Sequence, residues 1–220
     1  MLTPEHSALL IDGAKFFNVE LTEEHLSQIA VYIGELKRWA RIVNLVSQPE
    51  TEAIIRKHIL DSLAALTVLP PNGHVLDVGS GAGFPGLPLA IASPTLSVTL
   101  LEPRRKRVNF LKEVIRKAKL TNIHVYEGRI EELKKSEKMN AVFEIIITRA
   151  TWNIREFLTL VSPFLSNDGI MISMKGSNVE AELKNEASWL SRSGCILKSH
   201  FGYILPFGDE KRALLVFSLS

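Results

Sequence analysis

The chain has 220 residues, of which 46% are hydrophobic and 23% are charged, and its formal net charge is only +2. Such a chain can bury a full core as one domain with an extension, and the small net charge does not by itself indicate nucleic-acid binding. No stretch approaches the ~20 consecutive apolar residues of a membrane span and no signal peptide precedes the first element, so we expect a cytoplasmic protein.

The first 70 residues are expected to form helices. Thr3 followed by Pro4 begins one helix, and Thr22 followed by two glutamates begins a longer one, because threonine caps helix starts and proline is tolerated in the first turn. Apolar residues recur along the second helix at spacings of three and four, at Leu26, Ile29, Ile33, Leu36, Ala40 and Val43. A third helix is expected over residues 52–66, before a Pro-Pro-Asn-Gly break. Residues 1–70 are therefore expected to form an N-terminal helical extension.

From residue 74 onward, short apolar runs alternate with amphipathic stretches, and this alternation predicts a parallel sheet covered by helices. Five parallel strands are expected, over residues 74–78, 97–101, 122–126, 143–148 and 169–174. The last two runs, 195–203 and 213–219, leave no room for a helix between them and predict an antiparallel hairpin. Cys195, the single cysteine, can form no internal disulfide and is expected to be buried. Residues 71–220 are thus expected to form a Rossmann-like α/β domain with a mostly parallel seven-stranded sheet, an architecture typical of methyltransferases.

A glycine-rich loop follows the first expected strand. Gly79, Gly81 and Gly83 alternate with other residues behind Asp77. Glycines let the backbone turn sharply and let a ligand lie against it without Cβ atoms in the way. A carboxylate two residues ahead of the first glycine can receive the ammonium of a methionine moiety, directly or through water. The loop therefore favours a nucleoside cofactor that carries methionine.

Two other interpretations of this loop are open. Gly81, Gly83 and Gly86 satisfy the G-x-G-x-x-G pattern of a dinucleotide site, with Glu102 near the expected distance. The strand does not lead directly into the first of these glycines, however, and residues 84–85 stiffen the turn where a pyrophosphate needs open amides. A plain structural turn is the third interpretation. We favour the methionine-bearing cofactor over both.

The segment after the second expected strand carries a carboxylate and then a run of cations. Glu102 ends that strand, where it can accept both ribose hydroxyls of an adenosine, and pairing with the basic residues that follow is an alternative that can hold as well. Four cations, residues 104–107, open the next helix against its macrodipole, so an external anion such as an RNA phosphate would favour them. Residues 34–120 hold 13 Lys and Arg against 7 Asp and Glu, a surplus of six positive charges. The alternative, to which we give equal weight, is that these cations only face solvent.

Several separated motifs resemble the ribosomal RNA small subunit methyltransferase G family, also called glucose-inhibited division protein B. Its members methylate N7 of a guanine in bacterial 16S rRNA. The resemblance covers residues 36–219. The motifs are Arg56 to Leu63, Asp77 to Gly86, Lys106-Arg107 with Phe110-Leu111, Arg129 with Glu131-Glu132, Thr148-Arg149-Ala150, and Lys175-Gly176.

This resemblance implies S-adenosylmethionine as the cofactor and 16S rRNA or the small ribosomal subunit as the partner, with no metal and no membrane, and a monomer is expected. The expected cofactor-binding residues are Gly79, Gly81, Gly83, Phe84, Glu102, Ile130, Glu131 and Arg149. The candidate RNA contacts are Lys106 and Arg107 of the basic run, to which the resemblance adds Lys175 and Arg212. No catalytic side chain is named, because guanine N7 has a lone pair and no proton to lose.

Two other functions stay open on the sequence alone. A methyltransferase that acts on another RNA, a small molecule or a protein would keep the glycine loop, although the last two substrates need no basic helix. A non-catalytic RNA-binding protein would keep the basic helix, and its cofactor pocket would be vestigial.

Overall fold

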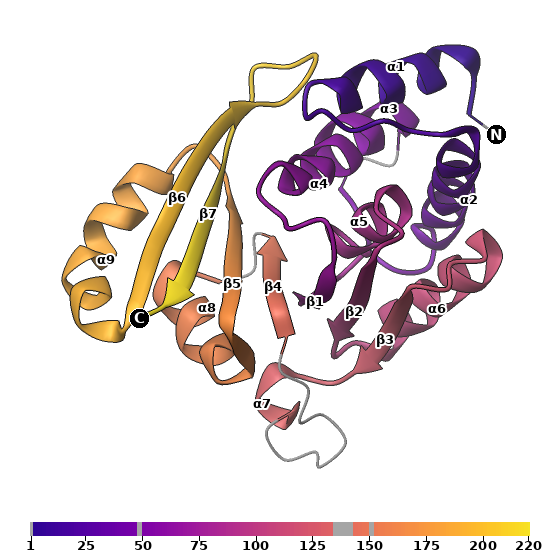
Figure 1. Ribbon diagram of the computed structural model, residues 1–220. Coiled ribbons are helices and arrows are strands. Elements are labelled where there is room, and N and C mark those ends of the chain that lie inside the picture. Colours follow the sequence, from indigo (N-terminus) through magenta and orange to yellow (C-terminus); the bar gives the residue numbers. More distant parts are fainter. Residues whose placement is uncertain (1, 48–49, 134–142, 150–151) are drawn as a thin grey trace.

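The computed structural model describes residues 2–47, 50–133, 143–149 and 152–220, and Figure 1 shows how they are arranged. The chain begins with α1 (Pro4–Lys15) and α2 (Glu23–Trp39). Both helices begin where expected, because the Thr3 and Thr22 side chains each accept a hydrogen bond from a backbone N–H in the first turn. The prediction extended the apolar face of the second helix too far, to Val43, whereas α2 ends at Trp39.

The third helical segment runs from Thr51 to Thr67 and changes its type along the way. It consists of α3 (Thr51–Ile54), a π turn (Ile55–Leu60), α4 (Asp61–Leu63) and a 3-10 turn (Ala64–Thr67). The expected helix over residues 52–66 is thus present, but its apolar spacing did not predict the π turn. π turns are rare in proteins, but many of those that occur lie at functional sites. This one places Lys57 and His58 at the site described below.

Seven strands form one sheet in the order β3-β2-β1-β4-β5-β7-β6. They are β1 (Gly73–Val78), β2 (Leu96–Glu102), β3 (Ile123–Glu127), β4 (Phe143–Arg149), β5 (Leu165–Lys175), β6 (Cys195–Ile204) and β7 (Lys211–Leu219). The first five are parallel, and β7 pairs antiparallel with both β5 and β6, which confirms the expected hairpin. Cys195 is buried, as expected. Ala150, the last residue of the Thr148-Arg149-Ala150 motif, lies outside the described residues.

Helices cover both faces of the sheet (Figure 1). The N-terminal helices lie on one face with α5 (Gly86–Ala92) and α6 (Arg105–Ala118), and the other face carries α7 (Ile130–Leu133), α8 (Ile154–Val161) and α9 (Val179–Ser193). The N-terminal helices contribute to the same hydrophobic core as one face of the sheet, so they pack onto that face. Within the described ranges, no helix combines the length and the apolar character that crossing a membrane requires.

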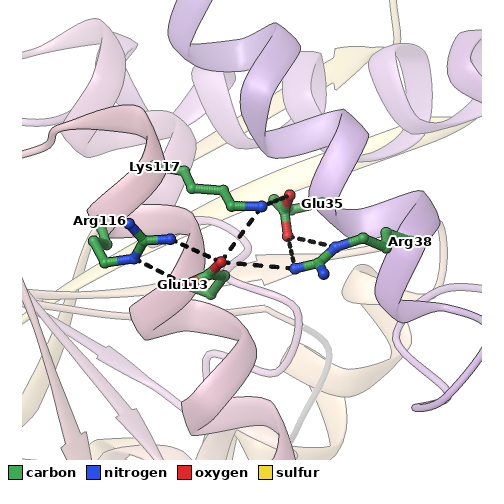
Figure 2. A network of polar contacts seen from close by, with 5 residues as sticks. All are labelled: Glu35, Arg38, Glu113, Arg116 and Lys117. Carbon is green, nitrogen blue, oxygen red and sulfur yellow. Dashed lines mark hydrogen bonds and ion pairs between the residues drawn. The ribbon is translucent and has the colours of Figure 1, made fainter.

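An ion-pair network joins α2 to α6 (Figure 2). The Glu35 carboxylate accepts hydrogen bonds from Lys117, at 2.6 Å, and from Arg38, and Glu113 pairs with Arg116 at 3.0 Å. Burial alone raises the pKa of Glu35, but the hydrogen bonds from Lys117 and Arg38 outweigh it, so the pKa lies below its usual value. Arg116 and Lys117 thus have acidic partners within the protein.

Candidate active site

Two pockets lie side by side at the edge of the sheet where the parallel strands end. The first, of about 390 Å³, lies beyond the ends of β1, β2 and β3, and the second, of about 300 Å³, lies beyond the ends of β4 and β5. Lys175, which lines the second, donates a hydrogen bond of 2.8 Å to the carbonyl of Trp152, which lines the first. The strand order reverses between β1 and β4, and open α/β sheets bind ligands at such a point.

Four of the expected cofactor-binding residues meet at the first pocket. Gly79 follows β1, Glu102 ends β2, and Ile130 and Glu131 begin α7. They come together because the carboxyl ends of parallel strands share one edge of the sheet. Trp152 also lines this pocket and was missed by the sequence analysis. Its only signal was its position shortly after the fourth strand.

The glycine loop has a backbone conformation that glycine adopts far more readily than other residues. Gly79, Gly81 and Gly83 have positive φ angles of 74°, 58° and 95°. Of the three, Gly79 lines the first pocket. A Cβ atom on Gly83 would lie 2.3 Å from a methyl group of Leu87, so the packing of α5 also requires glycine there. The loop is therefore fixed by backbone conformation and packing, and Gly79 is where it meets the pocket.

Glu102 is held in place by backbone groups around the first pocket. Its side chain is only 3% exposed, with Oε2 accepting a hydrogen bond from the Gly81 N–H and Oε1 one from the Arg104 N–H, each at 2.9 Å. The Arg107 guanidinium lies 3.9 Å from the same carboxylate. A carboxylate offers about four lone-pair positions, so two backbone bonds leave acceptors for two ligand hydroxyls. Glu102 thus contacts Arg104 and Arg107, which follow it in the sequence, and still has free acceptors for a ligand.

Asp77 contributes a second buried carboxylate, in β1. Its Oδ2 accepts a hydrogen bond of 2.9 Å from the Gly86 N–H, whereas the buried Oδ1 has no hydrogen-bond partner among the described residues. Burial raises the pKa of Asp77 to about 7. A buried acceptor without a partner costs free energy until a ligand or water supplies a donor. Asp77 does not itself line the first pocket, but a buried carboxylate with one free acceptor close to the anchored Glu102 fits a ligand that carries both a cationic group and paired hydroxyls, as S-adenosylmethionine does.

Cations gather at the second pocket. Arg149 ends β4, Lys175 ends β5 and Arg212 lies on β7, and all three line the pocket. The buried Asp61 carboxylate holds two of them, at 3.3 Å from Arg149 Nη1 and 3.6 Å from Arg212 Nε. The same carboxylate accepts a hydrogen bond of 2.7 Å from the Tyr203 hydroxyl. Asp61 was not among the residues predicted from the sequence, and its signal was its place in the Arg56 to Leu63 motif.

His58, from the π turn, packs against Arg149. Its Nδ1 lies 3.1 Å from Arg149 Nη2, and because a guanidinium only donates, Nδ1 accepts and the imidazole is neutral. Burial, followed by the charges of three nearby cations, lowers the pKa of His58 to about 3. The imidazole stacks on Phe84 with centroids 5.0 Å apart, and Arg149 Cζ lies 4.8 Å from the same Phe84 centroid. Phe84 therefore supports Arg149 at the second pocket and does not line the first.

A family model described as rRNA small subunit methyltransferase G matches residues 25–202 of this chain. The chain belongs to this family. The ribosomal RNA small subunit methyltransferase G of Syntrophus aciditrophicus is 36% identical over 214 residues, which are 96% of this chain and 89% of that protein. The one of Desulfotalea psychrophila is also 36% identical and covers 93% of this chain and 94% of its own. The chain is thus an S-adenosylmethionine-dependent methyltransferase that modifies a guanine in 16S rRNA, which sets the alternative functions aside.

Solved structures of other methyltransferases share the fold of this family member. The B. subtilis M1A22 tRNA methyltransferase TrmK has a TM-score of 0.56 at 14% identity, over 73% of this chain and 65% of that one. The structure of M. jannaschii TYW2 in complex with AdoMet has a TM-score of 0.53 at 17% identity, over 70% of this chain and 72% of that one. At such identities the likeness shows the fold alone, and it confirms the expected S-adenosylmethionine methyltransferase fold.

Two of the residues expected to contact the rRNA substrate lie at the second pocket, in different surroundings. Lys175 is 11% exposed and also donates a hydrogen bond of 2.9 Å to Glu182, so two of its three N–H donors are used within the protein. Glu182 in turn accepts a hydrogen bond from the Ile154 N–H, at 2.7 Å. Lys175 therefore ties the segment after β4 to α9, whereas Arg212 borders the pocket with a side chain that is 27% exposed.

The other two expected RNA contacts lie at the start of α6. Lys106 is exposed, and no side-chain partner of it is found in the described part of the chain. Arg107 lines the first pocket and donates a hydrogen bond of 3.3 Å to the Asn44 carbonyl. The two neighbours thus face different surroundings, and a change of Arg107 also disturbs the first pocket. Across the described ranges, no three His, Cys, Asp or Glu side chains gather as metal ligands would.

Proposed function

We propose that the first pocket binds S-adenosylmethionine and that the target guanine of 16S rRNA enters the second pocket, where N7 receives the methyl group. The observation that carries this proposal is the adjacency of a pocket with an anchored carboxylate and a pocket lined by cations, joined where Lys175 meets Trp152. When bound, S-adenosylmethionine supplies a methyl group on a positively charged sulfur.

Each part of the cofactor has a partner in this proposal. Glu102 accepts hydrogen bonds from the ribose hydroxyls, and Asp77 attracts the methionine ammonium, directly or through water. Gly79 lets the cofactor approach the backbone, and the peptide groups at Ile130 and Glu131 meet the adenine edge. The other expected cofactor residues act on this arrangement indirectly. Gly81 fixes Glu102 through its amide, Gly83 allows the loop to pack on α5, and Phe84 supports Arg149.

Arg149 is the residue that we propose to position the target nucleotide. Guanine N7 attacks with its own lone pair and loses no proton, so the protein needs no general base and contributes chiefly by alignment. Asp61, His58 and Phe84 each contact the guanidinium and fix its orientation. His58 is neutral and engaged with Arg149, which suits a positioning role. Arg149 then directs the base or its phosphate toward the first pocket.

The direct test is methylation of 16S rRNA by the purified protein with isotopically labelled S-adenosylmethionine. We expect labelled N7-methylguanine at one position of the RNA, identified by nuclease mapping and mass spectrometry. Deproteinised 16S rRNA and small ribosomal subunits are both offered, which shows which of them the protein accepts. Label on the ribose, on another base atom, or on no RNA at all would contradict the proposal.

The affinity for S-adenosylmethionine is expected to depend on pH through Asp77. Because burial raises the pKa of this carboxyl to about 7, it becomes neutral as the pH falls, and a neutral acid attracts the ligand ammonium less. Affinity is therefore expected to fall several-fold between about pH 7.5 and about pH 6, as measured by calorimetry. Asp77→Asn keeps an acceptor for the Gly86 N–H and is expected to bind weakly with no such dependence. A wild-type affinity that is constant over this range would contradict the ammonium contact.

The start of α6 is expected to contact RNA phosphates through its exposed cations. Changing Arg105 and Lys106 to alanine should reduce the slope of log K for RNA against log salt concentration by roughly 0.7–0.9 for each phosphate that the protein no longer neutralises. Both residues are exposed and neither lines the first pocket, so the affinity for S-adenosylmethionine should stay unchanged. Lys184→Ala, on exposed α9, is the matched control. An unchanged slope in the double variant would mean that this surface is only solvated.

We further propose that the protein acts as a monomer in the cytoplasm, on 16S rRNA or the small ribosomal subunit. One chain supplies the residues of both pockets, so the proposed site does not require a second copy. Sedimentation of the purified protein at micromolar concentration is expected to give a single species near the mass of one chain, 24.5 kDa.

A further inference from the structure

Two aromatic side chains are exposed together at the turn between β6 and β7. Phe207 lies in the turn and is 47% exposed, and Phe16, just after α1, is 68% exposed. Their ring centroids are 6.1 Å apart, in an edge-to-face arrangement. Figure 1 shows this turn beside the end of α1. We call these two side chains the aromatic tip.

The backbone of Phe207 is in a conformation that aromatic residues rarely adopt. Its φ angle is +62°, in the left-handed region, where glycine or asparagine is favoured. Such a conformation costs free energy. Phe207 packs against Phe16, yet nearly half of its side chain stays in water. The exposed part of the ring is therefore available for a contact with a ligand.

Contacts through Tyr203 connect the aromatic tip to the second pocket. The Tyr203 hydroxyl is bonded to Asp61 in the pocket, and the Tyr203 ring packs against Phe17, the neighbour of Phe16, with centroids 5.5 Å apart. Phe207 follows Tyr203 by four residues, so their Cα atoms can be no more than about 14 Å apart. A nucleotide strand that enters the second pocket thus passes within reach of the aromatic tip.

The charges of the turn indicate what kind of contact the aromatic tip makes. Asp209 and Glu210 lie just after Phe207, and Glu210 pairs with Lys57 at 3.6 Å. The cations Arg56 and Lys57 lie beside the same turn, so acidic and basic groups offset one another there and the contact depends on the rings. The flat faces of the rings suit an unpaired base, because single-stranded RNA is bound chiefly by stacking its bases on aromatic side chains.

We propose that Phe16 and Phe207 form a stacking platform for an unpaired base of the RNA that flanks the target guanine. This inference rests on the proposed function, in which the guanine enters the second pocket. The platform holds the neighbouring nucleotide outside the RNA stack, so the strand is already opened where the target base must be reached. It contributes affinity without any ionic contact.

The test is the variant Phe207→Gly, which removes the ring and suits the positive φ angle, so the fold is retained. Its affinity for a labelled single-stranded oligoadenylate and for deproteinised 16S rRNA is expected to be about 5- to 100-fold weaker than that of the wild type. The salt slope of RNA binding and the affinity for S-adenosylmethionine are expected to be unchanged. Phe207→Trp should retain the RNA affinity. Ile196→Ala, at an equally exposed apolar residue of β6, is the matched control and should bind normally.

The outcomes separate this inference from the proposed function. A wild-type protein that binds and methylates 16S rRNA, with a Phe207→Gly variant that binds both RNAs equally well, overturns the platform alone. A variant weakened only toward the small ribosomal subunit overturns it in favour of a protein partner at the aromatic tip. A wild-type protein that neither binds nor methylates 16S rRNA overturns the proposed function and the platform with it.

Discussion

Replacing Arg149 by lysine is expected to lower kcat/KM for methylation of 16S rRNA by about a hundredfold or more, with a change of less than about threefold in the affinity for S-adenosylmethionine. The planar guanidinium uses Nη1 for Asp61 and Nη2 for His58 and packs over the Phe84 ring. A lysine ammonium keeps the charge but lacks the fork, so it cannot make these contacts together. The target nucleotide is then no longer oriented, while the first pocket keeps its carboxylates.

Arg155→Lys is the matched control for this change. Arg155 lies in α8 and also pairs with a carboxylate, Glu186, at 2.8 Å, but it is half exposed and lines neither pocket. Its variant is expected to keep full activity. Calorimetry with S-adenosylmethionine and initial rates with 16S rRNA together decide the role of Arg149. An equal reduction of cofactor affinity and activity in Arg149→Lys would assign Arg149 to the cofactor, as the family resemblance implies.

The sequence predicted those parts of the fold that depend on local signals. The threonine caps predicted the starts of α1 and α2 correctly, and the short gap between the last two apolar runs predicted the β6–β7 hairpin. The end of α2 was misplaced because the apolar spacing continues past Trp39, although the helix does not. The π turn from Ile55 to Leu60 had no local signal, because one inserted residue leaves the apolar pattern readable as an ordinary helix.

The same distinction applies to the site. Gly79 and Glu102 were predictable because they follow or end parallel strands, and such ends meet at one edge of the sheet, whereas Ile130 was implied by the family resemblance. The second pocket depends instead on contacts between distant segments. Asp61 and Tyr203 are 142 positions apart in the sequence, and no periodicity connects them. Likewise, the sequence does not show that Lys117 is paired within the protein, because its partner Glu35 lies 82 positions away.

Removing the Glu102 carboxylate is expected to weaken S-adenosylmethionine binding by about 10- to 150-fold, or ~1.5–3 kcal/mol, the range for hydrogen bonds to a charged group. Glu102→Ala deletes the acceptor of the ribose hydroxyls and also leaves the Gly81 and Arg104 N–H groups without their partner. Both effects act at the first pocket. The affinity for 16S rRNA in the absence of cofactor is expected to change much less, because the second pocket and the exposed side chains of Arg105 and Lys106 are retained.

Two further variants separate the contributions of Glu102. Glu102→Gln keeps one oxygen acceptor in a neutral side chain, so its affinity for S-adenosylmethionine is expected to lie between those of the wild type and Glu102→Ala. The matched control is Glu127→Ala. Glu127 ends β3, is the strand neighbour of Glu102 and has an exposed carboxylate, and its variant is expected to bind normally. Calorimetry at one pH and salt concentration compares all four proteins. A weakening of less than about threefold in Glu102→Ala would mean that this carboxylate serves the backbone amides around it and that the ribose is held elsewhere.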